Sequence, residues 1–144
     1  YDWVEPSVKI ANIIGKESGV DVSGHRFDFF EKNVILEVEN NSAFLTIHAM
    51  EQIGDRFDLF IESVFSAKPS LVVHYEPIYE LYDDTRLLDY LAKWYSEQRF
   101  YLAGFLDKLK DLDKEGKVKI FKVVRPRIGG ILHESSLIVW KPLL

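Results

Sequence analysis

Apolar residues follow two periodicities in the second half of the chain, and together these predict a strand, a long helix and another strand. Lys68–Glu76 (KPSLVVHYE) is a short apolar run that begins beside a proline, which is typical of a strand buried on both faces. Over Leu87–Leu112, leucine and aromatic residues recur at helical spacing, and Lys117–Val124 (KVKIFKVV) alternates like a strand. A helix that crosses between two strands indicates a parallel pair, as in a βαβ unit.

The first half of the chain predicts a helix, a connector and two strands. Pro6 and Gly15 bracket a short helical pattern, because proline suits the first helical position and glycine the position just beyond the end. A polar, glycine-punctuated connector completes residues 1–24. Asn33–Glu39 and Ala43–Met50 both have the pattern of a strand, and a polar turn separates them.

The remaining elements complete the predicted fold. Glu51–Ala67 carries the apolar face of a helix, Arg125–Gly130 (RPRIGG) is predicted as a loop, and Ile138–Trp140 lies in the final strand. This order favours a single three-layer α/β domain over residues 1–144, with a mostly parallel central sheet and a C-terminal β-hairpin. The last strand of the hairpin is expected to be antiparallel, at the edge of the sheet.

The composition indicates a cytoplasmic globular protein. The chain has 144 residues, of which 47% are hydrophobic, and this is enough for one domain with a core. No apolar run is long enough to span a membrane, and the absence of cysteine excludes disulfides and thiolate ligands. The net charge of −5 argues against a general polyanion binder, so any contact with nucleic acid requires a local basic patch.

The order KPSLVVHYE, long helix, KVKIFKVV, RPRIGG ends in a Gly129-Gly130 turn that is followed by His133 and by Ser135-Ser136. This order resembles the C-terminal half of a RecA-type ATPase core, as in archaeal RadA recombinases, their paralogues and KaiC-like proteins. The resemblance implies a RecA-like fold in which the loop after KVKIFKVV faces DNA or a neighbouring subunit.

The parts that hydrolyse ATP are missing from this pattern. The resemblance implies a phosphate-binding loop after Asn33–Glu39, but Glu39–Ser42 contains neither glycine nor lysine. Where the Walker B aspartate is expected, His74 and Tyr75 stand, with Glu76 just beyond. Without amides and a lysine for the phosphates, and without a carboxylate for Mg²⁺, phosphoryl transfer lacks its electrostatic parts. The sequence therefore predicts a pseudo-ATPase with no cofactor and no metal.

One basic cluster, Lys122, Arg125 and Arg127, lies at the predicted loop. By the resemblance, this loop contacts single-stranded DNA, and guanidinium groups suit phosphate recognition. An acidic protein partner is the alternative, and so is a cluster that only solvates a turn. Binding to DNA through phosphates is expected to weaken log-linearly with salt.

A metal-dependent nuclease is a rival interpretation. Asp28, Glu37 and Glu39 have the spacing of the PD-(D/E)XK-like core, in which carboxylates hold Mg²⁺ and a lysine assists the attacking water. Here Glu39 stands at the lysine position, which removes one charge from that mechanism. A solvated strand face explains the same pattern, because alternate residues of a strand share a face.

The histidines do not suggest a metal site. They have no tight ligand spacing, and a strand histidine such as His74 is more often a packed, hydrogen-bonded residue than a ligand. The four positions are His25, His48, His74 and His133.

Aromatic residues on the predicted long helix indicate a surface for a protein partner or for homo-oligomerisation, although a thick core would explain them equally well. They are Trp94, Tyr95, Phe100 and Tyr101. We therefore predict a non-catalytic binding or regulatory subunit, with DNA recombination or repair as its setting. An interaction module with no role in nucleic-acid binding is the alternative beside the nuclease.

Overall fold

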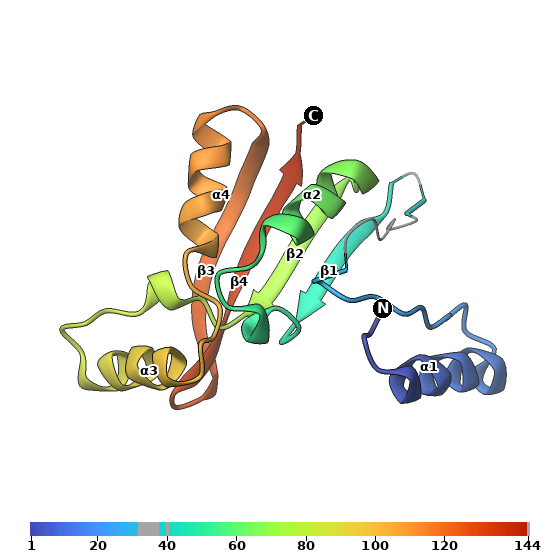
Figure 1. Ribbon diagram of the computed structural model, residues 1–144, viewed down its shortest axis with the longest axis horizontal. Helices are drawn as coiled ribbons and strands as arrows, with labels where there is room; N and C mark the ends of the chain where they lie inside the picture. Colours follow the sequence, from blue (N-terminus) through green and yellow to red (C-terminus); the bar gives the residue numbers. More distant parts are fainter. Residues whose placement is uncertain (32–37, 40, 144) are drawn as a thin grey trace. The chain divides into compact units, whose positions relative to one another are not determined.

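The computed structural model describes residues 1–31, 38–39 and 41–143, which belong to two compact units, Tyr1–Val34 and Ile35–Leu144. Figure 1 labels the helices and strands of both units. Among the described residues, the first unit holds one helix and the second holds the sheet.

The first unit consists of helix α1 (Glu5–Ser18) and an extended segment that returns along it. The predicted end at Gly15 is wrong, because the helix continues and ends before Gly19, whose φ of 67° is left-handed. Gly15 serves another purpose: a Cβ there would lie 2.0 Å from the carbonyl oxygen of Val22. Glycine is required at this position because the returning segment passes directly over the helix.

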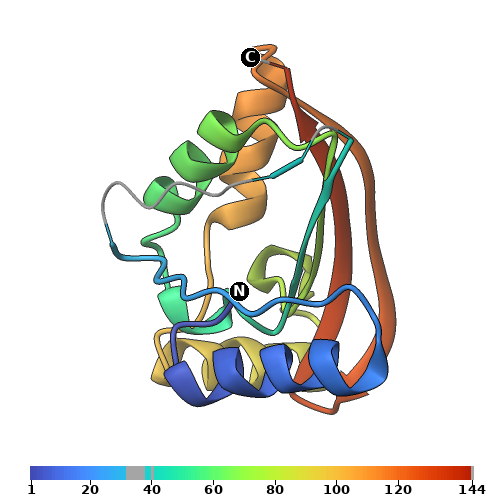
Figure 2. The same cartoon turned by 90° about the vertical axis from the view of Figure 1, so that its right-hand side faces the viewer.

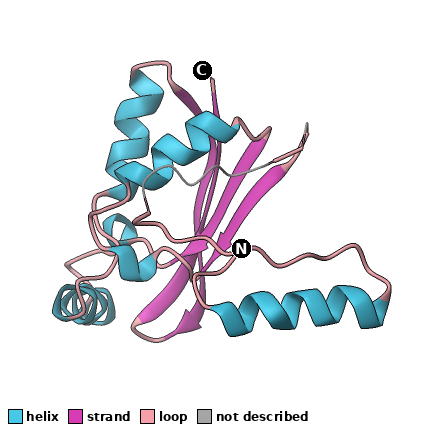
Figure 3. Cartoon of the chain, turned by 45° about the vertical axis from the view of Figure 1, so that its right-hand side comes forward, coloured by secondary structure: helices cyan, strands magenta, loops and turns pink. Residues whose placement is uncertain are grey.

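The second unit is built on one four-stranded sheet with the order β1-β2-β4-β3 (Figure 1; Figure 3). The strands are β1 (Ala43–Ile47), β2 (Leu71–Glu76), β3 (Val118–Gly130) and β4 (His133–Pro142). β1 and β2 are parallel, whereas β4 is antiparallel to both β2 and β3. The prediction of a three-layer, mostly parallel, RecA-like core is therefore wrong: the sheet is mixed and has one parallel pair.

The position of β4 explains this error. Because β2 and β3 are both antiparallel to β4, they run in the same direction, as a crossover connection requires. They are not neighbours, however, because β4 lies between them. The pattern predicted that the last strand would lie at the edge of the sheet, and this is wrong. Ile138 and Trp140 of β4 are fully buried, so the burial of large apolar side chains favours the central position.

The hairpin formed by β3 and β4 is longer than predicted. Arg125–Gly130, predicted as a loop, belongs to β3 and pairs in part with the start of β4. The register shifts between Val124 and Ile128, and Arg127 within the shift has a φ of 57°. This β-bulge accommodates a proline and leaves some residues without ladder partners. A bulged strand can therefore contain residues that are typical of a loop. The predicted strand Asn33–Glu39 lies mostly outside the described residues.

Helices α2 (Asp58–Ala67) and α4 (Phe105–Lys114) cover one face of the sheet, as Figure 2 shows. The rings of Phe60 on α2 and Phe105 on α4 both meet the ring of His74 on β2, with centroid distances of 5.8 and 5.0 Å. The core of the second unit therefore lies between these two helices and the sheet.

The long helix predicted over Leu87–Leu112 is wrong. The chain forms α3 (Leu87–Gln98) and then α4 as separate helices. Gly104 precedes α4 with a φ of 84°, a conformation that suits glycine. In the same connection the backbone N–H of Leu102 donates a 2.8 Å hydrogen bond to the carbonyl oxygen of Glu51. Apolar residues continue at helical spacing across the break, although Leu87, Leu88 and Trp94 of α3 are exposed. The pattern alone therefore does not reveal the break.

Two short 3-10 helices complete the second unit, η1 (Glu51–Ile53) and η2 (Tyr79–Leu81). The helix predicted over Glu51–Ala67 therefore starts as η1, and α2 itself begins only at Asp58. Its predicted end before Pro69 is confirmed.

The face of the sheet opposite α2 and α4 is uncovered by any described helix of the second unit (Figure 2). Its apolar side chains include Leu45 and Ile47 of β1 and Phe121 of β3, all of which are exposed. Within the second unit, the described elements thus form two layers and not the three that the sequence predicted.

An ion-pair network joins the hairpin to α3. The Arg125 guanidinium on β3 lies 2.8 Å from a carboxylate oxygen of Asp89 on α3 and 2.8 Å from one of Glu134 on β4. It also lies 4.6 Å from the ring centroid of Tyr82. Because Arg125 and Asp89 are largely buried, removal of either partner would leave a buried charge without compensation.

We expect Asp89→Asn to lower the free energy of unfolding by about 3 kcal/mol, since it leaves the Arg125 guanidinium buried with one carboxylate partner fewer. Denaturant unfolding monitored by tryptophan fluorescence measures the change. Asp111→Asn is the matched control: Asp111 pairs with Lys114 on the exposed side of α4, and its loss should leave the free energy almost unchanged.

The difference in the free energy of unfolding between the parent and Asp89→Asn should depend on pH because of the ion pair. The hydrogen bond from Arg125 holds the pKa of Asp89 well below its usual range. A carboxylate with a depressed pKa in the folded state stabilises the fold fully above the unfolded pKa of about 4, and this stabilisation is lost as pH falls. The gap between the parent and Asp89→Asn should therefore narrow below about pH 4. A gap that widens on acidification would contradict the assignment.

Candidate metal centre at the carboxyl ends of the parallel strands

Three histidine and carboxylate residues converge at one edge of the sheet. β1 and β2 are parallel, so their carboxyl ends meet there, and the antiparallel β4 begins at the same edge. His48 follows β1, Glu51 lies in η1 just beyond, and His133 is the first residue of β4. Ligand sites of open α/β sheets lie beyond the carboxyl ends of their parallel strands, and this cluster occupies the equivalent place.

The two imidazole rings converge on one oxygen of Glu51. Its Oε2 atom lies 2.6 Å from Nε2 of His133 and 3.1 Å from Nδ1 of His48. The backbone holds His48 in place, because its N–H donates to the carbonyl oxygen of Tyr75 and its φ of 48° is left-handed. All three side chains are partly open to solvent, and Glu51 is the least exposed of them.

Ser135 contacts the other nitrogen of His48. Its Oγ lies 2.7 Å from Nε2 of His48, across 87 residues of sequence. A carboxylate can only accept, so a proton on Nδ1 of His48 would be donated to Glu51 and would leave Nε2 to accept from the Ser135 hydroxyl. The residues thus form a hydroxyl–imidazole–carboxylate chain.

Aromatic rings border the cluster. The ring of Tyr75 lies 6.4 Å from that of His48, and the rings of Tyr95 and Tyr101 lie 6.1 and 5.5 Å from that of His133. Ser135 itself is only 2% exposed. The nitrogens and the carboxylate are therefore more accessible than the hydroxyl, and the surroundings of the cluster are aromatic on several sides.

Of the predicted Walker B region, His74 and Glu76 lie in the core, whereas Tyr75 lies beside this cluster. His74 is fully buried: Nε1 of Trp140 donates to its Nε2 at 2.9 Å, and its Nδ1 lies 2.7 Å from Oγ1 of Thr46. This agrees with the interpretation of His74 as a packed, hydrogen-bonded residue. Glu76 is also fully buried and accepts the N–H of Ala49 at 3.0 Å.

Burial controls the charge of both residues. It lowers the pKa of His74 to about 3, so the imidazole is neutral near pH 7. Burial also raises the pKa of Glu76, against the hydrogen bond from Ala49, which lowers it. Both groups are thereby suited to a core and not to a solvent-exposed Mg²⁺ shell, while Tyr75 between them points to the other face and borders the cluster.

The predicted basic cluster does not form one exposed surface, because only two of its three residues are exposed. Arg125 is committed to Asp89 and Glu134. Lys122 and Arg127 are exposed on β3, and within the described part of the chain neither makes an ion pair. Contact with single-stranded DNA or an acidic partner stays a prediction, with Lys122 and Arg127 as its accessible residues.

The proposed nuclease residues are not seen together. Asp28 lies in the first unit, where its side chain accepts the N–H of Phe30 at 2.9 Å. Glu39 is exposed in the second unit, and Glu37 lies outside the described residues. That grouping also stays a prediction.

The aromatic residues that were assigned to one long helix divide into two sets. Trp94 and Phe100 are exposed, whereas Tyr95 and Tyr101 are half-buried beside His133. A protein partner or a second copy at the exposed set stays a prediction.

Sequence reasoning missed the cluster because Glu51 and His133 are 82 residues apart. One local signal was present: His48 and Glu51 are three residues apart, at the carboxyl end of the predicted strand Ala43–Met50. A histidine at a strand's carboxyl end with a carboxylate one turn later is a reason to look for a third ligand elsewhere.

No protein-family model, curated protein or solved structure matches the chain. The resemblance to RecA-type cores stays a prediction on the residues that suggested it. None of the helices among the described residues is long and apolar enough to cross a membrane.

We expect the buried His74 to make stability depend on pH. Its pKa of about 3 in the folded state lies below the unfolded value of 6.5, so only the unfolded state binds a proton between these values. Stability then falls on acidification by about 1.4 kcal/mol per pH unit from this group. His74→Asn keeps a donor and an acceptor but does not titrate. The free energy of unfolding of this variant should therefore change less steeply with pH between pH 6 and 4, by about 1.4 kcal/mol per pH unit.

The slope is measured by urea unfolding at several pH values. His25→Asn is the control, because His25 is exposed in the first unit and its replacement should leave the slope of the parent. An unchanged slope in His74→Asn would show that the histidine is not held neutral by the core.

Proposed function

We propose that His48, Glu51 and His133 bind a divalent transition-metal ion, with Zn²⁺ as the ion that fits best. One observation carries the proposal: a single carboxylate oxygen of Glu51 lies within 3.1 Å of one nitrogen from each of two imidazoles. The three ligand atoms all lie within 4.8 Å of one another. Two imidazoles and one carboxylate are a ligand set that suits Zn²⁺ or Fe²⁺.

The distances support this ligand set. Ligand atoms at about 2.1 Å from a tetrahedral ion lie roughly 3.4 Å apart. The ligand atoms of Glu51 and His133, now 2.6 Å apart, would separate by less than about 1 Å, which small rotations of these partly exposed side chains allow. Nδ1 of His48 would ligate the ion in place of its hydrogen bond to Glu51.

Ser135 would orient one of the proposed ligands, His48, without binding the metal itself. A metal-bound histidine usually directs its second nitrogen to a hydrogen-bonding group that fixes the ring. Nε2 of His48 has such a group at 2.7 Å in the Ser135 hydroxyl. The ring of His48 is therefore already oriented with Nδ1 towards Glu51 and His133.

Three protein ligands leave one position of a tetrahedral ion open. In such a position Zn²⁺ activates a water molecule or polarises a substrate oxygen. Of the protein's own groups, Tyr75, Tyr95 and Tyr101 would limit the shape of an approaching molecule. A non-catalytic role, as the sequence predicts, is compatible with a metal that only organises this edge of the sheet.

A second candidate is metal-independent acid–base chemistry by His48. The 2.7 Å contact to the Ser135 hydroxyl and the 3.1 Å contact to Glu51 form the arrangement in which a carboxylate orients a histidine base. Because Ser135 is 2% exposed, attack by Ser135 on a large substrate is disfavoured. In this candidate a substrate hydroxyl would take the serine's place at Nε2.

Metal binding is tested by calorimetric titration of the EDTA-dialysed protein with ZnCl₂, and by Co²⁺ absorption. We expect one ion per chain, with the visible d–d bands of four-coordinate Co²⁺. Glu51→Gln and His133→Ala should each weaken binding at least about tenfold, since each removes one of three ligands.

His25→Ala is the control, because it removes an exposed histidine far from the cluster in sequence and should leave binding unchanged. If the parent binds neither ion, or if His25→Ala weakens binding as much as His133→Ala does, the proposal fails. Ser135→Ala separates metal binding from metal-independent acid–base chemistry. It should weaken metal binding modestly, because the ring of His48 loses its hydrogen-bonding partner. It should leave acid–base chemistry on an added alcohol unchanged, because the alcohol takes the place of the serine hydroxyl.

A further inference from the structure

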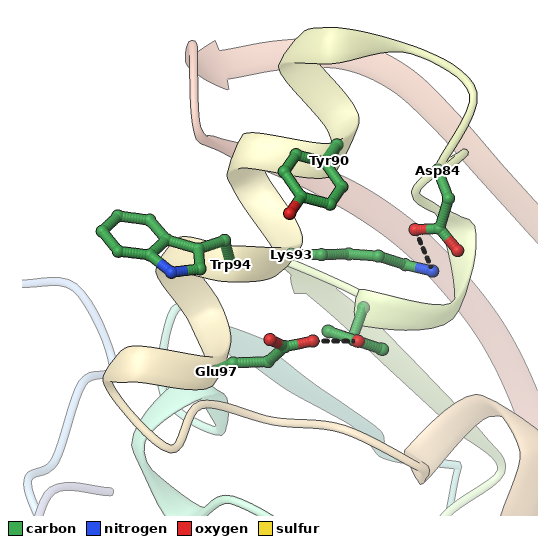
Figure 4. Close-up of a pocket in the computed structure, with 6 residues that line it drawn as sticks. Asp84, Tyr90, Lys93, Trp94 and Glu97 are labelled. Atoms are coloured by element: carbon green, nitrogen blue, oxygen red, sulfur yellow. Dashed lines mark hydrogen bonds and ion pairs between the residues drawn. The ribbon is translucent and has the colours of Figure 1, made fainter.

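A pocket of about 370 Å³ lies along α3 and does not include the residues of the metal cluster (Figure 4). It combines three aromatic rings with two carboxylates and one amine. The lining residues are Tyr79, Asp84, Tyr90, Lys93, Trp94 and Glu97.

Helical spacing builds one wall of this pocket. Tyr90, Lys93, Trp94 and Glu97 are three or four residues apart on α3, so they share one face of the helix. Tyr90 and Trp94, one helical turn apart, are 55% and 53% exposed, which is unusual for large aromatic residues. Their faces are therefore available to a ligand.

The pocket already holds one cation of its own. Nζ of Lys93 lies 2.8 Å from Asp84 and 4.9 Å from the centroid of the Tyr79 ring. Figure 4 shows the lysine side chain extending from α3 towards Asp84, below Tyr90. This contact neutralises Asp84 and shows that an ammonium group fits between a carboxylate and an aromatic face here.

Glu97 has no such cation. Its Oε1 accepts a 2.5 Å hydrogen bond from the Tyr79 hydroxyl, and this bond raises the pKa of Tyr79 to about 12, so the phenol remains a neutral donor. Within the described part of the chain Glu97 makes no ion pair. No described cation therefore pairs with this carboxylate, which lines the same pocket as the exposed Trp94.

We propose that this pocket binds a small organic cation, an alkylated ammonium group, between the rings of Tyr90 and Trp94 and the carboxylate of Glu97. The electrostatics select the class of ligand. Two carboxylates and one amine give the lining a net charge of −1, so an anion is repelled. Aromatic faces attract a cation that is weakly hydrated, and an alkylated ammonium loses less hydration than a bare one.

Choline chloride is the probe, and the indole N–H signals of the three tryptophans report on its binding by NMR. We expect a saturable shift of the Trp94 signal, with those of Trp3 and Trp140 unchanged. Tyr90→Ala keeps the Trp94 signal as the reporter and should weaken binding about tenfold. Glu97→Gln should weaken it by a similar factor, since it removes the charge and keeps an acceptor for Tyr79.

Two matched controls make the test decisive. Glu62→Gln removes an exposed carboxylate from α2 and should leave the affinity unchanged. The signal of the buried Trp140 should keep its position in every variant, which shows that the fold is intact. Equal binding of 3,3-dimethylbutanol, the uncharged isostere of choline, would show an apolar pocket and overturn the proposal. So would the absence of a saturable shift of Trp94, or binding that Glu97→Gln leaves unaltered.

Discussion

The pairing of β4 with β2 is the constraint on which the second unit depends. It places Trp140 over His74, where the indole N–H donates to the imidazole in a fully buried position. Both polar groups are thereby satisfied inside the core, and an unsatisfied group there would cost on the order of 1–3 kcal/mol. The same pairing carries His133 and Ser135 to the edge where β1 and β2 end. One strand thus sets the order of the sheet and supplies one of the three proposed metal ligands, together with the serine that contacts another.

His74 and His48 take opposite roles because one lies within a strand and the other lies just beyond the end of one. His74 points to the face covered by α2 and α4, where burial keeps it neutral. His48 lies just past the end of β1, where a left-handed backbone turns its ring towards Ser135 and Glu51. The chemistry available to each ring follows from this placement, since only a partly exposed nitrogen can exchange a hydrogen bond for a metal ion or a substrate.

Some local structure could be predicted from the sequence, whereas the neighbours of each element could not. The apolar run of Leu71–Glu76 and the end of α2 before Pro69 are visible in the pattern, because they depend on residues close in sequence. The insertion of β4 between β2 and β3 depends on which buried side chains fit together, and periodicity does not report this. Gly15 shows the same limit: it reads as a helix stop, but it is required by a segment that crosses the helix seven residues later.

Helix α3 connects the two candidate sites, and the Arg125 network holds it. Tyr95 faces His133, while Trp94, one residue earlier, faces the pocket with Glu97. A rotation of the helix about its axis would therefore move both sites at once. Asp89, on the first turn of α3, is bound to Arg125 of the hairpin, and this largely buried pair resists such a rotation. Since β4 of the same hairpin carries His133, one ion pair fixes the position of α3 relative to the strand that supplies a metal ligand.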